Sequence, residues 1–335
     1  MQTGIDILEN DILEKYPEVL DTLLRDHTTQ KNIFWATDNY DHLGREYSFG
    51  AQILTDLITG NNGEIVMPRV HKSLLLQQNR SKEMAEVFTP SWICNAQNNL
   101  IDNTWFGREN VFNIEKRNSN GNSWIVNDEK IIFPENKRWI DYVNDTRLEV
   151  ACGEAPYITS RYDTTTGDFI PVRQRIGILD RKLRVINENV HTSGPWLKAV
   201  QDAYKSTYAF EWQGDNLLLA REAMLITFIE NYNFKFSKEP LVKSIKFIAY
   251  IISWNVWQMD GLKGVIPDSC GEIQKKTINL FGEEETDNSF CSGCLNNNIL
   301  KHNGVYCLIK DWKKKDLESG RKGLKIKFVD LLKNK

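Results

Sequence analysis

The stretch LEVACGEAPY, Leu148–Tyr157, decides the fold that the sequence predicts. The run Arg147–Ala151, which overlaps its start, is typical of a β-strand, and the glycine after that run marks a tight turn toward a helix. A second stretch, YAFEWQGDNLLLARE at Tyr208–Glu222, likewise combines a strand with the start of a helix. In an open α/β sheet such turns lie at the carboxyl ends of the strands, where small ligands bind. The sequence therefore predicts an α/β fold with a ligand site at these two strand ends.

Hydrophobic periodicity extends this prediction along the chain. Apolar residues recur at helical spacing over Ile5–Leu24, and Pro17 divides them into two short helices. The polar segment RNSNGNS, Arg117–Ser123, has the composition of a surface loop. We expect a helical N-terminal region at 1–84 and a core at 85–335. The other helices expected are Phe49–Thr59, Lys72–Glu86, Pro90–Ile101, Arg181–Asn189, Trp196–Tyr204, Asn216–Tyr232 and Leu241–Met259, and the other strands are Tyr208–Trp212, Gly304–Ile309 and Leu324–Phe328.

Composition limits the class of protein. A chain of 335 residues with 41% hydrophobic content can fill one large core without disulfides. No apolar run reaches the roughly 20 residues of a membrane helix, and Met1–Asn10 is acidic, so we expect a cytoplasmic protein with no membrane partner. The net charge of −3 provides no overall attraction for nucleic acid. Four basic residues that could contact phosphates are interpreted as parts of solvated faces, namely Arg80, Lys82, Lys137 and Arg138.

The two strand ends carry residues suited to a nucleoside ligand. Gly153 and Ala155 leave the turn free of bulky side chains, and Glu149 lies inside the first strand. Glu211 ends the second strand, where a carboxylate binds ribose hydroxyls. Asp180 also ends a strand-like run and competes for the same role. Taken alone, a glycine turn more often simply reverses the chain, and a strand-end acid is more often solvated.

Four segments in order carry a family resemblance: AEVFTPSW (Ala85–Trp92), LEVACGEAP, YAFEWQGDNLLLAR and VYCLIKDW (Val305–Trp312). Together they resemble the adenine-N6 DNA methyltransferases of restriction–modification systems, especially the large type II modification subunits. The resemblance covers about residues 80–335. It implies a Rossmann-like, S-adenosylmethionine-dependent methyltransferase core with a small cysteine-containing insert, acting on duplex DNA.

The resemblance implies roles for residues around the first strand. Phe88, Thr89 and Pro90 would pack over the methionine part of S-adenosylmethionine. Thr89 and Pro90 also fit a plain helix start, as the N-cap and the first helical residue. Ala155 replaces a glycine that is frequent in the family. The residues of the turn implied to contact the methionine end are Glu149, Ala151, Cys152, Gly153 and Ala155.

The resemblance also implies partners for the rest of the cofactor. Glu211 would accept hydrogen bonds from the ribose hydroxyls. We prefer it to Asp180 because Ala220 and Arg221 follow it at the family spacing. Asp311 in CLIKDW would lie beside the adenine amino group.

The family's catalytic element is missing from this sequence. That element is a tetrapeptide of Asn or Asp, Pro-Pro and an aromatic residue, which receives the flipped adenine. All nine prolines here are isolated, so no catalytic residue is assigned. The sequence stops at GLKIKFVDLLKNK, about where the family would supply the tetrapeptide, and we expect a second chain to provide the catalytic loop and target-recognition domain. The alternatives are a catalytically silent DNA-binding or regulatory protein, and a methyltransferase for RNA or protein.

The cysteines indicate a metal site in the insert at 267–307. Cys291-x-x-Cys294 has the spacing of a metal knuckle, and His302 and Cys307 would complete a tetrahedral, structural zinc site. Cys270 is a fifth candidate and could replace His302. Redox-active or unliganded thiols are the alternatives.

Overall fold

The computed structural model places three parallel strands in one sheet, in the order β3 (Arg147–Val150), β4 (Thr207–Glu211) and β5 (Val256–Gln258). Because the strands are parallel, each connection must cross back over the sheet through helices. The described residues are 5–7, 9–83, 86–118, 121–271, 273–278, 284–316, 320 and 322–333.

Two pairs of helices make these crossovers. The first pair, between β3 and β4, is α6 (Ile178–Asn189) and α7 (Ser193–Lys205). The second, between β4 and β5, is α8 (Gly214–Phe236) and α9 (Val242–Asn255), which pack against each other. These connections bring the carboxyl ends of all three strands to one edge of the sheet, as the α/β prediction requires. The mixed helix-and-sheet architecture agrees with that prediction.

The N-terminal part contains both helices and irregular segments. Pro17 is the first residue of its helix, which confirms the predicted break. The helix predicted over Phe49–Thr59 is wrong, because the segment forms turns with one short 3-10 helix. The helices of this part are α1 (Glu9–Lys15), α2 (Pro17–Leu24), α3 (Leu74–Glu83) and α4 (Ser91–Phe106), and the 3-10 helices are Asp41–Leu43, Arg45–Tyr47, Thr55–Leu57, Gly60–Asn62 and Arg69–His71.

The remaining strands form three antiparallel hairpins. Most of the segment predicted as a loop at Arg117–Ser123 belongs to one of them, so that prediction is wrong. The hairpins are β1 (Asn113–Asn118) with β2 (Gly121–Val126), β6 (Ile273–Ile278) with β7 (Glu284–Ser289), and β8 (Leu308–Lys315) with β9 (Lys322–Lys327). The other elements are α5 (Trp139–Val143), α10 (Ser292–Leu295) and the 3-10 helices Val172–Gln174 and Phe328–Leu332.

Two hydrophobic clusters hold these elements together. The larger cluster fills the space among α2, α6, α7, α8 and α9. In the smaller one, Phe210 of β4 and Trp257 of β5 pack against Cys307 and Ile309, which anchors the β8–β9 hairpin on the sheet. Within the described part of the chain, no helix combines the length and apolar character needed to cross a bilayer.

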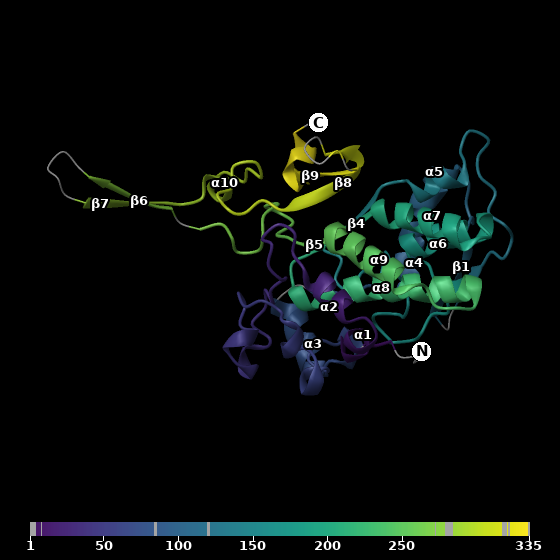
Figure 1. Ribbon diagram of the computed structural model, residues 1–335, viewed down its shortest axis with the longest axis horizontal. Coiled ribbons are helices and arrows are strands. Elements are labelled where there is room, and N and C mark those ends of the chain that lie inside the picture. The colour runs from purple at the N-terminus through teal and green to yellow at the C-terminus, as the bar shows by residue number, and fades with distance from the viewer. Residues whose placement is uncertain are drawn as a thin grey trace.

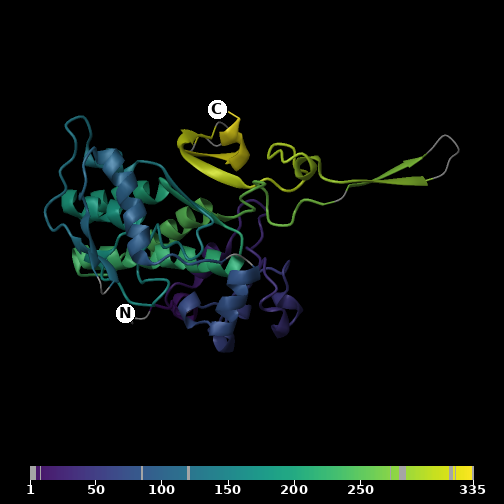
Figure 2. The same cartoon turned by 180° about the vertical axis from the view of Figure 1, so that it is seen from behind.

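The β6–β7 hairpin is set apart from this body. Figure 1 shows it projecting as an arm beyond α10, and the reverse view in Figure 2 shows the same projection. Its strands pair in register from Ile273 opposite Ser289 to Ile278 opposite Glu284. The base of the arm therefore lies where the chain enters β6 at Ile273 and leaves β7 at Ser289.

Candidate functional site

The turn after β3 joins the backbone of one strand end to the side chain of the next. The N–H of Gly153 donates a hydrogen bond to Glu211 Oε2 at 2.8 Å. Ala151, Gly153 and Ala155 all have positive φ, at 51°, 53° and 59°. This conformation costs an L-residue about 1–2 kcal/mol. Surrounding contacts must therefore hold the two alanines in place.

A cavity of about 160 Å³ lies beside this turn. Its walls come from the segment before α4, from the turn after β3 and from the end of β4. The predicted residues that line it are Phe88, Thr89, Glu149, Ala151, Cys152, Gly153 and Glu211. The structure thus brings three separate segments together at one cavity, as the sequence predicts.

Phe88 closes one side of the cavity against the turn. A Cβ atom built on Gly153 would lie 3.8 Å from Cζ of the Phe88 ring, so the ring borders the space that a side chain at residue 153 would enter. The Arg69 guanidinium also lies 5.1 Å from the centroid of the Phe88 ring, which is a cation–π contact. These two contacts fix the aromatic wall.

The start of α4 differs by one residue from the expected one. Pro90 is the N-cap residue and Ser91 the first helical residue, so Thr89 does not cap the helix. The carboxylate of Asp163 accepts the hydrogen bond from the Ser91 N–H at 2.7 Å instead. Thr89 is therefore free to line the cavity, whereas Pro90 does not line it.

Two of the carboxyl groups that line the cavity, those of Glu149 and Glu211, come from the strand ends. Glu149 Oε2 is shielded from solvent and has no hydrogen-bond partner among the described residues. Loss of hydration raises the pKa of Glu149 well above that of an ordinary glutamate, and burial also raises the pKa of Glu211. A buried polar atom without a partner is costly. A ligand that donates hydrogen bonds or carries positive charge would satisfy it.

Asp180 does not compete with Glu211 for this cavity. Its Oδ2 accepts hydrogen bonds from the backbone N–H groups of Ser160 at 2.8 Å and Gly177 at 3.2 Å. Gly177 is the N-cap residue of α6, so Asp180 stabilises the start of that helix.

The positions of Asp311 and Ala155 require a correction. Asp311 lies on β8, which pairs with β9 and with none of the three parallel strands. Its carboxylate accepts a hydrogen bond from the Lys313 N–H at 3.0 Å, and it borders a separate groove of about 1200 Å³ beside α7 and α9. Ala155 is fully buried beneath the turn. The structure brings neither side chain to the cavity.

A buried ion-pair network beside the cavity is not predicted by the sequence. Arg80 is fully buried, not solvated, and its guanidinium contacts Glu86 Oε2 at 2.6 Å and Asp215 Oδ2 at 2.8 Å. It also donates to Gln213 Oε1. Burial alone would raise the pKa of Asp215, but the charges of Arg80 and Lys72 hold it below the ordinary value.

This network positions cavity-lining residues that have no sequence signal of their own. Glu86, Gln213 and Asn216 all line the cavity. Asn216 Nδ2 donates to Glu86 Oε2 at 3.1 Å. Glu86 lies far along the chain from Gln213 and Asn216, so only their shared contact with Arg80 identifies the three as a group.

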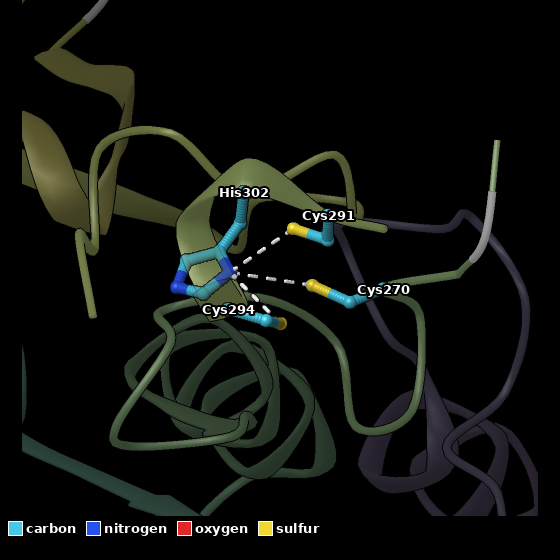
Figure 3. A group of neighbouring side chains, drawn as sticks. All are labelled: Cys270, Cys291, Cys294 and His302. Atoms are coloured by element: carbon cyan, nitrogen blue, oxygen red, sulfur yellow. Dashed lines mark hydrogen bonds between the residues drawn. The ribbon is translucent and has the colours of Figure 1, made fainter. Parts of the chain in front are cut away.

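A second group of side chains, at the base of the arm, converges as metal ligands do (Figure 3). The Nδ1 atom of His302 lies 3.5 Å from Sγ of Cys270, 3.5 Å from Sγ of Cys291 and 3.6 Å from Sγ of Cys294. All four ligand atoms lie within 4.8 Å of one another. These four residues, the Cys3His group, could hold a metal ion such as zinc.

Cys307 is not part of this group, which corrects the predicted ligand set. Its thiol is fully buried in the smaller hydrophobic cluster, where Sγ donates to the Gln258 carbonyl at 3.3 Å. Cys270 takes the place of Cys307 in the ligand set, and His302 remains a ligand. The strand register explains the exchange, because pairing of Ile273 with Ser289 carries Cys270 toward Cys291.

Comparisons with known proteins leave the chain unassigned. No protein-family model, no curated protein and no solved structure matches it.

Proposed function

We propose that this chain is the S-adenosylmethionine-binding part of an adenine-N6 DNA methyltransferase of a restriction–modification system, built on a Rossmann-like core. The observation that carries the proposal is the hydrogen bond from the Gly153 N–H to Glu211, at the carboxyl ends of parallel strands. A glycine turn beside an acid on the neighbouring strand is how α/β sheets hold nucleoside ligands. Its position beside Phe88 and Thr89 supports the same proposal.

Four residues of the cavity have assigned roles in this proposal. Glu211 accepts hydrogen bonds from ribose hydroxyls, and Gly153 keeps the turn free of a side chain. Phe88 packs over the methionine part. Glu149 supplies an unpartnered carboxyl oxygen that suits a cationic ligand. The bound cofactor supplies an activated methyl group.

We infer that a second chain supplies the catalytic tetrapeptide and the domain that recognises duplex DNA, since this sequence contains no Pro-Pro. The free edge of β3 supports this part of the proposal. β3 pairs with β4 on one side and with no other described strand, and Leu148 and Val150 on it are 44% and 64% exposed. An unpaired edge with exposed apolar side chains favours association. The two chains would work together in the cytoplasm.

Calorimetric titration with S-adenosylmethionine tests cofactor binding directly. We expect the wild-type chain to bind, and Glu211→Ala to weaken binding about 10- to 100-fold, since hydrogen bonds to a charged group are lost. Gly153→Asp should abolish binding, because the new side chain enters the cavity beside Phe88 and adds another acidic group to its lining.

Asp311→Ala is the matched control, because the structure places that acid away from the cavity. Its affinity should equal that of the wild type. Unchanged affinity in both Glu211→Ala and Gly153→Asp would contradict the site, and the silent DNA-binding alternative would then be favoured.

The partner is tested by co-expression with the adjacent reading frame, if that frame encodes Asn-Pro-Pro-Tyr or a close variant. We expect adenine methylation only when both chains are present. Methylation by the partner alone would contradict the proposed division of labour.

A further inference from the structure

The convergence of three sulfur atoms on one nitrogen needs a physical explanation. His302 Nδ1 has either one proton or one lone pair, so it can make one good hydrogen bond and not three. Yet Cys270, Cys291 and Cys294 all place Sγ within 3.6 Å of it. A cation between His302 Nδ1 and the sulfur atoms accounts for the three sulfur–nitrogen separations at once.

The separations match one ion in particular. Zinc binds sulfur at about 2.3 Å and nitrogen at about 2.0–2.1 Å, and tetrahedral angles then separate the two ligand atoms by roughly 3.6 Å. The observed sulfur–nitrogen distances are 3.5, 3.5 and 3.6 Å. Thiolate and imidazole ligands also select zinc over magnesium or calcium, which prefer oxygen.

We propose that the Cys3His group binds one zinc ion in a closed, structural site that fastens the base of the β6–β7 arm to the body. Four protein ligands complete a tetrahedron and leave no position for a reactive water. On binding, the three thiols lose their protons and the imidazole remains neutral.

The local backbone is built around these ligands. Cys291 is the N-cap residue of α10, and its sulfur accepts a hydrogen bond from the Asn303 N–H at 3.3 Å. Gly293, between the two knuckle cysteines, lies directly under the His302 ring. A Cβ atom there would come within 2.7 Å of His302 Nδ1 and 2.6 Å of its backbone nitrogen. Only glycine permits this approach of the knuckle to the histidine.

The position of the ligands gives the ion its structural role. Cys270 precedes β6 and Cys291 follows β7, so one ion ties together both chain ends of the arm. Cys294 and His302 come from the segment that returns to the body, where the Ile266 N–H donates to the Val305 carbonyl at 2.8 Å. Figure 3 shows the four side chains meeting at this junction. The ion would therefore fix the direction in which the arm projects.

Metal analysis of the purified full chain tests the ion. We expect one zinc per chain by mass spectrometry after purification without chelators. His302→Ala and Cys294→Ser should each reduce zinc to well below one equivalent. His302→Cys should retain it, because four thiolates also make a zinc site. Cobalt substitution should give the absorption of tetrahedral thiolate coordination.

Cys307→Ser and Cys94→Ser are the matched controls, since both thiols are buried outside the group. They should keep the full zinc content. A wild-type chain that binds no zinc after reconstitution would overturn the proposal. So would loss of zinc in Cys307→Ser with retention in Cys270→Ser.

Limited proteolysis tests the role in the arm. Removal of zinc, or Cys294→Ser, should accelerate cleavage within residues 271–290 at least several-fold, with little change elsewhere. Zinc binding without any change in that cleavage would overturn the structural role assigned to the ion. None of these measurements depends on S-adenosylmethionine binding.

Discussion

The N–H of Gly153 and the carboxylate of Glu211 join strand ends that lie 58 positions apart in the chain. The bond fixes the turn after β3, and the second carboxylate oxygen of Glu211 accepts the Gln213 N–H at 3.2 Å. Glu211 thus accepts backbone hydrogen bonds both from the turn after β3 and from Gln213, which follows the end of β4. Its remaining lone pairs are the part available to a ligand in the cavity.

The turn predicts opposite stability changes at two neighbouring residues. Gly153→Ala should lower the free energy of unfolding by about 1–2 kcal/mol, because its φ of 53° strains an L-residue. Ala151→Gly should raise it by up to about 1 kcal/mol, because Ala151 is exposed and has a φ of 51°. Urea unfolding monitored by circular dichroism measures both. Changes of the same sign would show that the turn is not held in this conformation.

Glu149 predicts a pH dependence of cofactor binding. Loss of hydration raises the pKa of Glu149, so its carboxyl group stays protonated at low pH. A cationic ligand favours the ionised form of the same group. Affinity for S-adenosylmethionine should therefore increase with pH as the group ionises, with proton release on binding. Glu149→Gln should bind more weakly and remove most of that increase. Calorimetry in buffers of different ionisation enthalpy measures the released protons, and equal proton release in both proteins would contradict the assignment.

The buried network beside the cavity predicts a large stability effect. Arg80→Ala should reduce the free energy of unfolding by about 3–5 kcal/mol, because Glu86 and Asp215 would remain buried without the guanidinium that pairs with both, and only Lys72 would be left beside Asp215. Arg138→Ala is the control, since its ion pair with Asp141 is exposed to solvent and its loss should leave the free energy of unfolding nearly unchanged. Denaturant unfolding of both variants distinguishes them. Equal effects would mean that Arg80 is solvated.

The elements predicted correctly from the sequence are those with a strong local pattern. β3, α6, α7 and β4 all have clear periodicity and turn signals at their ends. The predicted helix Leu241–Met259 absorbed β5, because Trp257 continues the apolar spacing of α9 while the backbone changes to a strand at Val256. A three-residue strand has too little pattern of its own to be separated. The polar β1–β2 hairpin likewise lacks the alternation that identifies strands.

In the candidate sites, too, residues with a local sequence signal are predicted correctly and residues placed by long-range contacts are not. The Cys291-x-x-Cys294 spacing is local, and the sequence indicated it, whereas the place of Cys270 depends on strand pairing across the arm. The resemblance implies that Asp311 lies beside the adenine amino group, but its strand, β8, belongs to a separate hairpin with β9. The burial of Arg80 depends on partners more than 130 positions away. Long-range contacts of this kind leave no trace in local spacing.

A pair of buried acids predicts how stability depends on pH. Glu9 of α1 and Glu222 of α8 are both fully buried, and their carboxyl oxygens have no hydrogen-bond partners among the described residues. Burial raises the pKa of Glu9 to about 9, and burial together with the charge of Glu9 raises the pKa of Glu222 well above its ordinary value. The folded protein therefore favours the protonated acids.

The sign of the effect follows from these shifts. Below pH 4.5, the ordinary pKa of glutamate in the unfolded chain, both the folded and the unfolded state hold the Glu9 proton. The contribution of protonated Glu9 to the free energy of unfolding is then fully present. As the pH rises from 4.5 toward about 9, the unfolded state releases a proton that the folded state keeps. The free energy of unfolding should then fall by about 1.4 kcal/mol per pH unit for each such group. Glu9→Gln should flatten this decline and stabilise the protein at neutral and alkaline pH, whereas Glu14→Gln, at an exposed position of the same helix, should leave it unchanged. Thermal unfolding across this pH range measures the slope, and an equally steep decline in Glu9→Gln would show that Glu9 does not hold a proton in the folded state.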